Sequence, residues 1–451
     1  MKPFALKSRR VATPEGLGRA VVVVSGGAVA AVLPYDAAPE GLELRDLGDL
    51  ALLPGLVDTH AHVNEPGRAE WEGFETATRA AAAGGITTVV DMPLNSIPAT
   101  TTKEALLAKR AAADGRCAVD YGFWGGVVPG NAGELAPMAA EGALGFKCFL
   151  VPSGVDEFPH VREADLKAAM PVLAKLGLPL LVHAELEGPC GPAGPWRRYA
   201  GYLASRPRDW EDRAVRLMVR LCRETGCRVH IVHLSSSGAL AEVAAAKKEG
   251  LPFTVETCPH YLTFCAEDIE DGQTPFKCAP PIREAENREK LWDALRSGLI
   301  DMVVSDHSPC TPALKDLEGG DFQKAWGGIA GLQFSLSAVW TGMKARGLGL
   351  GELAHLMSRT PAHFAGLAAR KGGLAFGKDA DLVVFDPEAT LTPQPFGVLH
   401  RHPVTPYCGR PLSGAVRTTY LRGVPVYDGG TFPGGPSGRP AVRRAAAEAV
   451  R

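Results

Sequence analysis

The sequence lacks a surplus of either charge, which excludes several classes of partner. Its 48 basic and 50 acidic side chains nearly cancel and leave a net charge of −2. A protein that follows the phosphates of a nucleic acid shows a basic surplus, so we expect no nucleic-acid partner. With 46% hydrophobic and 22% charged residues, the composition is that of an ordinary soluble protein.

Long hydrophobic runs are also missing. The longest apolar run near the N-terminus, residues 20–33, spans 14 residues and holds two glycines, which is too short to cross a bilayer. The opening residues, MKPFALKSRRVATPEG, contain neither a long apolar segment nor a clear cleavage site. We therefore expect a cytoplasmic protein with no membrane partner, while the few basic residues leave targeting to an organelle open.

The cysteines show no pairing pattern. All ten are scattered between positions 117 and 408, and none belongs to a Cys-x-x-Cys motif. Disulfide frameworks are typical of short secreted chains rather than of a 451-residue chain without a signal peptide. We interpret the cysteines as buried thiols of a reducing compartment.

What the sequence does contain is a regular alternation of apolar strands and amphipathic helices. The helical stretches are 71–83, 102–113, 163–176, 210–224, 238–248 and 287–296, followed by 334–344 and 350–357. The eight strand candidates are 52–60, 86–91, 119–128, 145–151, 179–183, 228–233, 252–257 and 300–305. This alternation predicts an α/β fold with a closed, TIM-like (β/α)8 barrel, whose active site lies at the carboxyl ends of the strands.

Both ends of the chain carry short strands and turns instead. Ser25-Gly26-Gly27 separates two apolar strands, which is typical of a hairpin, and short strands return at 380–385 and 416–426. We predict a small β-sandwich domain that is built from both ends of the chain. The predicted divisions are 1–51 and 366–428 for the two parts of the sandwich, 52–365 for the catalytic barrel and 429–451 for a Gly/Pro-rich surface tail.

The strongest chemical signal stands at the end of the first predicted strand, in the segment LLPGLVDTHAHVNEPG. His60 and His62 are two residues apart, so both imidazoles project from the same face of the strand. Two neutral imidazoles on a rigid strand end suit zinc or another borderline divalent ion. For an isolated His-x-His motif, the alternative is a pair of surface histidines in a turn.

Polar side chains occupy four further predicted strands. Lys147 lies in the fourth strand, and His183, His233 and Asp306 end the fifth, sixth and eighth strands. The gaps between them leave room for the intervening strands. We therefore expect these four side chains to meet the two histidines of the first strand at one rim of the barrel.

The remaining histidines are interpreted by position. His230 lies three residues before His233 and faces the opposite side of its strand, where packing against a helix is expected. By the same alternation His307 points away from Asp306, although the mouth of the barrel is within its reach. His260 is open between a role beside the substrate, a role behind a ligand and that of a plain loop residue. Five others are treated as structural: His160, His355, His363, His400 and His402.

Together these segments resemble a known enzyme family. PGLVDTHAH, GFKCFL, LLVHAE, HIVHLS and VVSDHSP are similar to the cyclic amidohydrolases of the amidohydrolase superfamily. An ammonium has no lone pair for a metal, but in that family the lysine equivalent to Lys147 carries a carbamate derived from carbon dioxide. The carbamate is an anionic bridge between two divalent metal ions. The alternative is a lysine paired with an acidic neighbour.

The resemblance implies how the two ions are held. The ligands are imidazoles, one carboxylate and the modified lysine: His60, His62 and Asp306 at the more buried ion, His183 and His233 at the other, and carbamylated Lys147 between them. Such nitrogen and oxygen ligands admit zinc, which we expect first, or manganese, cobalt, nickel or iron. Asp306 is also the expected catalytic residue, because its carboxylate can take a proton from the attacking water and pass it to the leaving nitrogen.

Smaller features separate the members of the family. Residues 62–101, GFKCFLVPSGVDEFPHV and ETCPHYLTF look closely like allantoinases, whose substrate allantoin is a neutral ureido-hydantoin. Dihydroorotases of this group usually carry an arginine where this chain has Asn64, and an amide cannot give a carboxylate two charged contacts. Dihydropyrimidinases and hydantoinases commonly place a tyrosine soon after the lysine, whereas residues 148–151 contain none.

The resemblance also implies substrate contacts and an assembly. Four residues are expected to hydrogen-bond the imide and ureido groups of the substrate: Asn64, Ser308, Cys278 and Ala279. A buried structural thiol is the alternative for Cys278. Relatives are often tetramers, so we expect a homotetramer. A hydantoinase or dihydropyrimidinase is the alternative enzyme, followed by a dihydroorotase, and a non-catalytic assembly protein that has lost its ligands is the alternative of another class.

Overall fold

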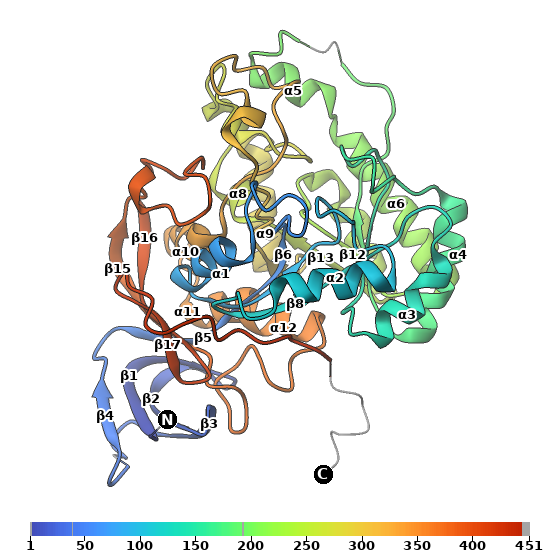
Figure 1. Cartoon of the computed structure of the whole chain (residues 1–451). Helices are drawn as coiled ribbons and strands as arrows, with labels where there is room; N and C mark the ends of the chain where they lie inside the picture. The colour runs from blue at the N-terminus through green and yellow to red at the C-terminus, as the bar shows by residue number, and fades with distance from the viewer. Residues whose placement is uncertain (1, 38, 192–193, 444–451) are drawn as a thin grey trace.

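The computed structural model describes residues 2–37, 39–191 and 194–443, and its centre is a parallel β-barrel (Figure 1). A parallel bridge between Ala61 and His307 joins the first strand to the segment after the last one. The barrel strands, paired in chain order, are β6 (Leu56–Ala61), β7 (Ile86–Asp91), β8 (Asp120–Phe123) with its short continuation β9 (Gly125–Gly126), β10 (Phe146–Phe149), β11 (Leu180–His183), β12 (Val229–Ile231), β13 (Phe253–Thr257) and β14 (Met302–Val303).

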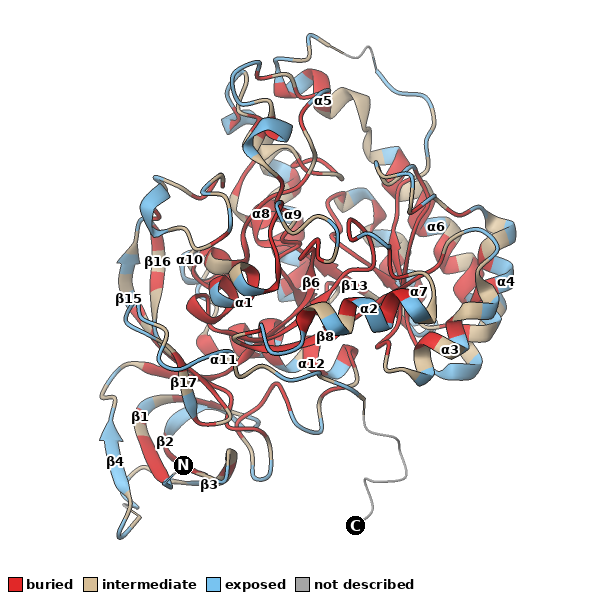
Figure 2. Ribbon diagram, in the orientation of Figure 1, coloured by how far each residue is buried: buried red, intermediate tan, exposed pale blue. Residues whose placement is uncertain are grey.

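Helices surround the barrel and cover its strands (Figure 2). They are α1 (Phe74–Ala83), α2 (Lys103–Ala113), α3 (Leu135–Ala140), α4 (Glu163–Leu176), α5 (Tyr199–Ser205), α6 (Arg208–Thr225), α7 (Leu240–Lys248), α8 (Pro259–Thr263), α9 (Ala285–Arg296), α10 (Ser335–Ala345), α11 (Leu350–Ala354) and α12 (Thr360–Phe364). In α6, buried residues recur every three or four positions, as a helix with one face on the core requires. Within the described ranges, none of the helices combines the length and the hydrophobicity that a membrane crossing needs.

Strands from both ends of the chain build the small β-sandwich. They are β1 (Phe4–Thr13), β2 (Gly16–Ser25), β3 (Ala28–Pro34), β4 (Glu43–Asp46) and β5 (Ala51–Pro54), together with β15 (Leu382–Leu391), β16 (Leu412–Leu421) and β17 (Val424–Asp428). β5 lies between β1, to which it is parallel, and β15, to which it is antiparallel. Alternate residues such as Leu6, Val22 and Leu382 share one apolar core. The predicted (β/α)8 barrel with a sandwich from both ends is therefore confirmed.

One predicted strand is divided in the structure. The sequence predicts a single strand over residues 52–60, but Leu52 pairs with Val384 in the sandwich, whereas Leu56 pairs with Ile86 in the barrel. The division falls at Gly55, where a Cβ atom would lie 2.2 Å from the hydroxyl oxygen of Thr87. A residue without a side chain is thus needed where the chain passes from one sheet to the other.

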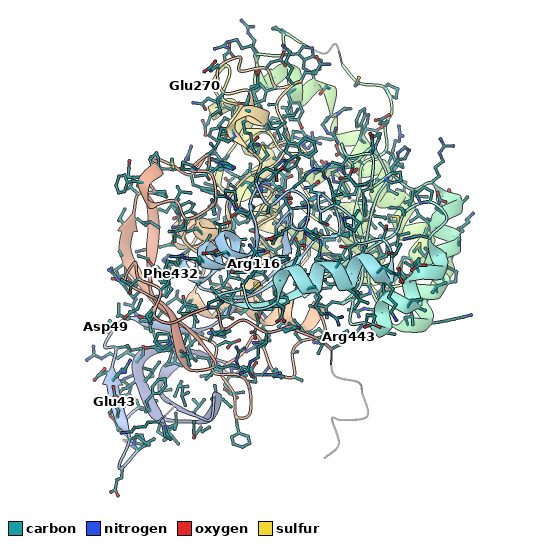
Figure 3. All side chains as sticks on the ribbon, in the orientation of Figure 1. Glu43, Asp49, Arg116, Glu270, Phe432 and Arg443 are labelled. Carbon is teal, nitrogen blue, oxygen red and sulfur yellow. The ribbon has the colours of Figure 1, made fainter. Side chains whose placement is uncertain are left out.

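The chain after β17 returns to the barrel. The Tyr121 N–H of β8 donates to the Arg439 carbonyl (3.1 Å), and the Ala441 N–H donates back to the Tyr121 carbonyl (2.7 Å). Earlier in this segment, Phe432 packs under the Arg79 guanidinium, and it lines the same surface pocket as Arg116 (Figure 3). Residues 437–441 of the predicted tail are therefore tied to a barrel strand, while its residues 444–451 lie outside the described part of the chain.

Candidate metal centre and active site

A cavity of about 340 Å³ opens where the barrel strands end. Its volume lies within the range of pockets that take small molecules. All six side chains that the sequence predicts as metal ligands line it: His60, His62, Lys147, His183, His233 and Asp306. Each of them is at least nine-tenths buried. The cavity thus gathers buried polar side chains at one end of an apolar barrel.

The local backbone explains how side chains from different strands reach one cavity. His60 and His62 stand on the same face at the end of β6, with ring centroids 5.6 Å apart. His233 and Asp306 lie two and three residues beyond their strands, with φ angles of 40° and 44°. Residues other than glycine rarely adopt this left-handed region, and those that do cluster at functional sites.

Three of the side chains form a first group of donors. The Nε2 atoms of His60 and His62 lie 3.2 Å and 3.6 Å from Oδ1 of Asp306. One potential ligand atom from each residue lies within 4.8 Å of the others. Two imidazole nitrogens and a carboxylate oxygen at this spacing are a donor set for a divalent transition metal.

A second pair of imidazoles lies beside the first group. Nδ1 of His183 and Nε2 of His233 face each other at 3.0 Å. The other ring nitrogen of His183, Nε2, is 2.7 Å from the Glu185 carboxylate and therefore carries the proton that donates to it. This tautomer leaves the lone pair of Nδ1 directed at His233, where a cation would join the two rings.

The amine of Lys147 completes the cavity between the two groups. Its Nζ atom is buried and has no hydrogen-bond partner among the described residues, and the same holds for Nε2 of His60. Buried polar atoms are nearly always paired, so unpaired ones in one cavity indicate a missing ligand. The donor atoms present therefore fit divalent metal ions, with the lysine needing a chemical change before it can bind one.

Burial and neighbouring carboxylates shift the pKa values of the cavity donors in different directions. Burial lowers the pKa of His62 and His233 well below the ordinary value, so both rings are neutral. Burial also disfavours the charged form of His60, but the carboxylates of Asp306 and Glu256 outweigh it and raise the pKa of His60 to about 9. Burial lowers the pKa of Lys147 to about 8.

Asp306 remains ionised in this cavity. Burial opposes its charge, but His60, His233 and His62 outweigh burial and hold the pKa of this carboxyl well below its usual range.

Glu256 is a functional candidate that the sequence reasoning missed. Its Oε1 atom is 2.5 Å from Nδ1 of His60, and its Oε2 atom is 2.9 Å from Nε2 of His230. These contacts outweigh the cost of burial and lower the pKa of Glu256 to about 2. As predicted, His230 packs on a helix, with its ring 4.1 Å from that of Phe364 in α12. The signal in the sequence is an acid in the otherwise buried strand β13.

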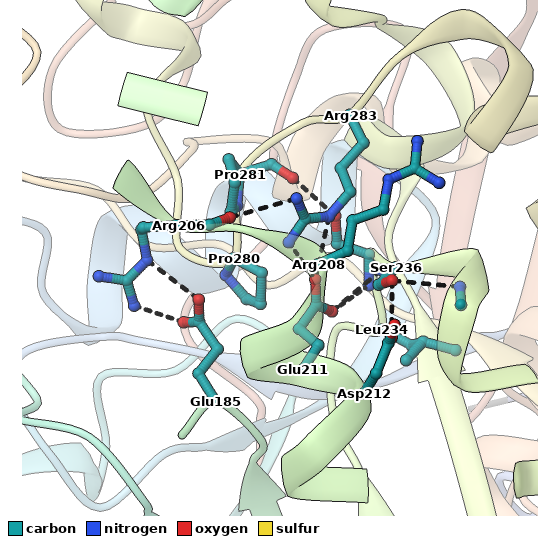
Figure 4. A network of polar contacts seen from close by, with 12 residues as sticks. Glu185, Arg206, Arg208, Glu211, Asp212, Leu234, Ser236, Pro280, Pro281 and Arg283 are labelled. Atoms are coloured by element: carbon teal, nitrogen blue, oxygen red, sulfur yellow. Dashed lines mark hydrogen bonds and ion pairs between the residues drawn. The ribbon is translucent and has the colours of Figure 1, made fainter. Parts of the chain in front are cut away.

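Glu185 holds the second imidazole in the same way. It follows His183 by two residues and is fully buried. Besides His183, it binds the guanidinium of Arg206, another residue of the cavity wall (Figure 4). A carboxylate behind a metal-binding histidine fixes the orientation of the ring. The His-x-Glu spacing is the sequence signal that could have identified it.

Comparison with known proteins agrees with this geometry. Residues 51–426 match the Amidohydrolase family. The chain belongs to this family. An allantoinase of Streptomyces avermitilis is 52% identical over 434 residues, which cover 95% of this chain and 96% of that protein. An allantoinase of Arabidopsis thaliana is 46% identical over 448 residues, with 95% and 88% covered.

Solved structures extend the similarity to the whole fold. The L-hydantoinase (dihydropyrimidinase) from Arthrobacter aurescens aligns with a TM-score of 0.91 and 32% sequence identity. The alignment covers 98% of this chain and 100% of that protein. The resemblance to cyclic amidohydrolases that the sequence predicts is thereby confirmed.

The predicted substrate contacts of this amidohydrolase fall into two groups. Ser308 and Ala279 line the cavity, and the Ser308 hydroxyl donates to Oδ1 of Asp306 at 2.9 Å. Asn64 and Cys278 are buried and do not belong to the lining. The Asn64 amide donates to the Pro309 carbonyl at 3.3 Å. Burial raises the pKa of Cys278 to about 12, so this residue is a thiol rather than a thiolate.

The two histidines with open interpretations lie behind the cavity wall of the amidohydrolase. His260 is buried, and potential ligand atoms of His260, Cys258 and Asp306 lie within 4.8 Å of one another. Burial lowers the pKa of His260 to about 4. His307 accepts a hydrogen bond from the Gly331 N–H (3.3 Å) and does not line the cavity. A ring nitrogen of His260 therefore lies near the Asp306 carboxylate, whereas His307 accepts the His62 N–H through its backbone carbonyl at 2.7 Å.

Proposed function

We propose that this amidohydrolase hydrolyses the hydantoin ring of allantoin to give allantoate, a step of purine breakdown. The observation that carries the proposal is the 52% identity to an allantoinase over nearly the full length of both proteins. The cavity supports it, because it gathers imidazoles, a carboxylate and a lysine at the carboxyl ends of a barrel.

We infer that two divalent metal ions bind in this cavity, with zinc expected first and manganese, cobalt, nickel or iron as alternatives. The proposed ligands are His60, His62 and Asp306 for one ion, His183 and His233 for the other, and a carbamate on Lys147 for both. The unpaired Nζ of Lys147 and the facing nitrogens of the last two histidines support this assignment. When bound, the ions supply Lewis acidity to the ring carbonyl and to the attacking water.

The chain's own residues move the protons of the reaction. Asp306 is ionised and takes the proton of the water as its oxygen forms a bond to the ring carbonyl carbon. The carbon–nitrogen bond of the ring then breaks, and Asp306 delivers the proton to the leaving nitrogen. The Ser308 hydroxyl, which donates to this carboxylate, fixes its orientation. The products are a ureido NH2 group and a carboxylic acid, which releases the second proton of the water to solvent and becomes a carboxylate.

Substrate binding is assigned to residues of the cavity other than the proposed metal ligands. Ser308 and the backbone at Ala279 line the cavity and can hydrogen-bond the imide group. Asn64 is proposed to act indirectly, because its amide holds the carbonyl of Pro309, the residue after Ser308. Cys278 is proposed to act through its backbone carbonyl, which accepts the Tyr202 hydroxyl at 2.7 Å.

A hydantoinase or dihydropyrimidinase remains the alternative, because the structure of one aligns over 98% of this chain. Metal-loaded protein should be assayed with allantoin, hydantoin, dihydrouracil and dihydroorotate. We expect kcat/KM for allantoin to exceed that of the other three at least about tenfold, since discrimination reflects contacts made in the transition state. Equal or faster hydrolysis of another ring would overturn the proposed substrate while leaving the metal chemistry intact.

We also propose that the protein acts in the cytoplasm as a homotetramer. All ten cysteines are free, which suits a reducing compartment. The tetramer rests on the resemblance to cyclic amidohydrolases, and light scattering on the purified protein tests it.

A further inference from the structure

A half-buried arginine stands in the cavity wall next to the proposed metal ligands. Arg206 directly follows α5, and its side chain lines the cavity. Its Nε atom donates to Oε1 of Glu185 at 3.1 Å, and its Nη2 atom donates to the other carboxylate oxygen. Figure 4 shows the third nitrogen, Nη1, on the side away from Glu185. Among the described residues, no hydrogen-bond partner of Nη1 is found.

A neighbouring arginine shows what a purely structural guanidinium looks like here. Arg283 binds Glu211 through Nε (3.1 Å) and Nη2 (2.6 Å), and its Nη1 atom donates to the Arg206 carbonyl at 3.2 Å. All three of its nitrogens are thus paired, and its side chain is 1% exposed. The Arg206 side chain is 23% exposed. Of these two buried or half-buried pairs, the one in the cavity wall leaves one charged donor open.

The rest of this wall offers the open donor no acid. Among the described lining residues, Asp306 is the only acidic one, and it belongs to the proposed metal ligands. The Lys277 ammonium donates to the carbonyls of Ala325 (2.5 Å) and Gln323 (3.2 Å). Nη1 of Arg206 is therefore a charged donor that has no acceptor among the described lining residues. Its complement is an oxygen acceptor on the ligand.

We propose that Arg206 recognises the ureido side chain of the substrate, with Nη1 donating to the ureido carbonyl oxygen. The proposal rests on the proposed function. Plain hydantoin lacks a ureido group, so Arg206 is a specificity-determining residue that separates allantoin from smaller rings. Because Glu185 binds both Arg206 and His183, the same carboxylate holds the recognition group and one proposed metal ligand.

The variant Arg206→Lys tests the proposal. Lysine keeps a positive charge for Glu185 but has no rigid fork that could also reach a ligand. We expect kcat/KM for allantoin to fall about 10- to 100-fold, the effect of losing one charged hydrogen bond. The inhibition constant of hydantoin, measured as a competitor of allantoin, should change less than about twofold, and bound metal should stay at the wild-type level. Arg283→Lys is the matched control. It should leave the preference for allantoin over hydantoin, expressed through the kcat/KM of allantoin and the inhibition constant of hydantoin, unchanged.

A second variant protects the test against misfolding. Glu185→Gln/Arg206→Gln removes both charges together, so no unpaired charge stays buried. Relative to Glu185→Gln alone, the double variant should lose kcat/KM for allantoin as Arg206→Lys does, while the inhibition constant of hydantoin stays unchanged.

Equal losses for allantoin and hydantoin, together with a loss of metal, would overturn the inference, because Arg206 would then act only through Glu185. Preferential hydrolysis of dihydroorotate by the wild type would overturn it as well, since the arginine would then pair with a carboxylate. If the wild type does not hydrolyse allantoin, the proposed function fails and this inference fails with it. If the wild type does, and Arg206→Lys retains the wild-type KM and kcat, only this inference fails.

Discussion

Behind the imidazoles of the cavity stand two buried carboxylates, each bound to the ring nitrogen that faces away from the proposed metals. Glu256 binds His60, and Glu185 binds His183. Such contacts fix the tautomer and raise the basicity of a ligand, so their loss weakens metal binding even though they touch no metal.

Glu256→Gln tests this at the residue scale. The amide keeps the shape of the side chain, but it is neutral and has one acceptor oxygen. It therefore cannot accept hydrogen bonds from both His60 and His230 as the carboxylate does. We expect metal affinity to fall about 10- to 100-fold, measured by competition with a chelator. Glu242→Gln, which changes a carboxylate on the outer helix α7, is the control. Unchanged affinity in Glu256→Gln would contradict the role given to this carboxylate.

Prediction from the sequence succeeded for side chains whose strand position decides where they lie. All six predicted ligands line the cavity, because the carboxyl ends of barrel strands meet at one rim. It could not identify Arg206, whose partner Glu185 is 21 residues away. Nor could spacing reveal that Asn64 has a φ angle of 66° and lies behind the wall, since one left-handed residue redirects the chain.

At the scale of elements, a buried charge network joins the amino end of β8 to the sandwich. The Lys371 ammonium lies 2.5–2.9 Å from carboxylate oxygens of Asp120, Asp379 and Asp381. The three carboxylates form a cluster that could suit a metal ion, but the ammonium already supplies the cation. Burial opposes its charge, yet Asp381, Asp120 and Asp379 outweigh burial and raise the pKa of Lys371 above 10.5.

Lys371→Met should therefore lower the free energy of unfolding by about 3 to 5 kcal/mol, because it removes the only cation among the described residues that contacts all three carboxylates and leaves Arg422 on Asp120 and Arg370 on Asp379. Urea unfolding measures this loss. Lys344→Met, which removes a half-exposed pair with Glu388, should cost less than about 1 kcal/mol. A similar loss in both variants would mean that the network contributes no more than a surface pair.

The pH dependence of the wild type follows from the same network. A pKa raised in the folded state gives a stabilisation that is complete below the unfolded value of 10.5 and disappears as the pH rises through the folded value. Wild-type stability should hence decline above pH 10.5 more than that of Lys371→Met.

Element boundaries were predictable where periodicity was strong and failed where two sheets share one apolar run. The predicted helix 163–176 coincides with α4. Residues 52–57 carry no polar side chain, so their pattern could not show that β5 and β6 belong to different sheets. The strand pairing reveals the boundary, because Leu52 pairs with Val384 and Leu56 pairs with Ile86.

At the scale of the whole molecule, metal removal should expose how far the barrel depends on its ions. The proposed ligands come from five strands, so ions bound to the folded state alone would stabilise all of them together. We expect chelated protein to be inactive and to unfold at a lower temperature than the metal-loaded form, as measured by calorimetry.

Bicarbonate should accelerate recovery when metal is returned, because a carbamate on Lys147 needs carbon dioxide. Lys147→Ala should hold fewer than two ions per chain and show no response to bicarbonate, which makes it the control. Two ions and full activity in Lys147→Ala would exclude the carbamate bridge. Elemental analysis and an activity time course provide both measurements.

The sandwich also imposes an order on biosynthesis. β5 ends at Pro54, but its antiparallel neighbour β15 begins only at Leu382. Since a ribosome releases the chain from its N-terminus, one edge of β5 stays open while the entire barrel is made. An unpaired strand edge is a template for wrong pairing with another nascent chain. Protein yield in cells should thus depend on chaperones that shield residues 51–54 until translation reaches β15.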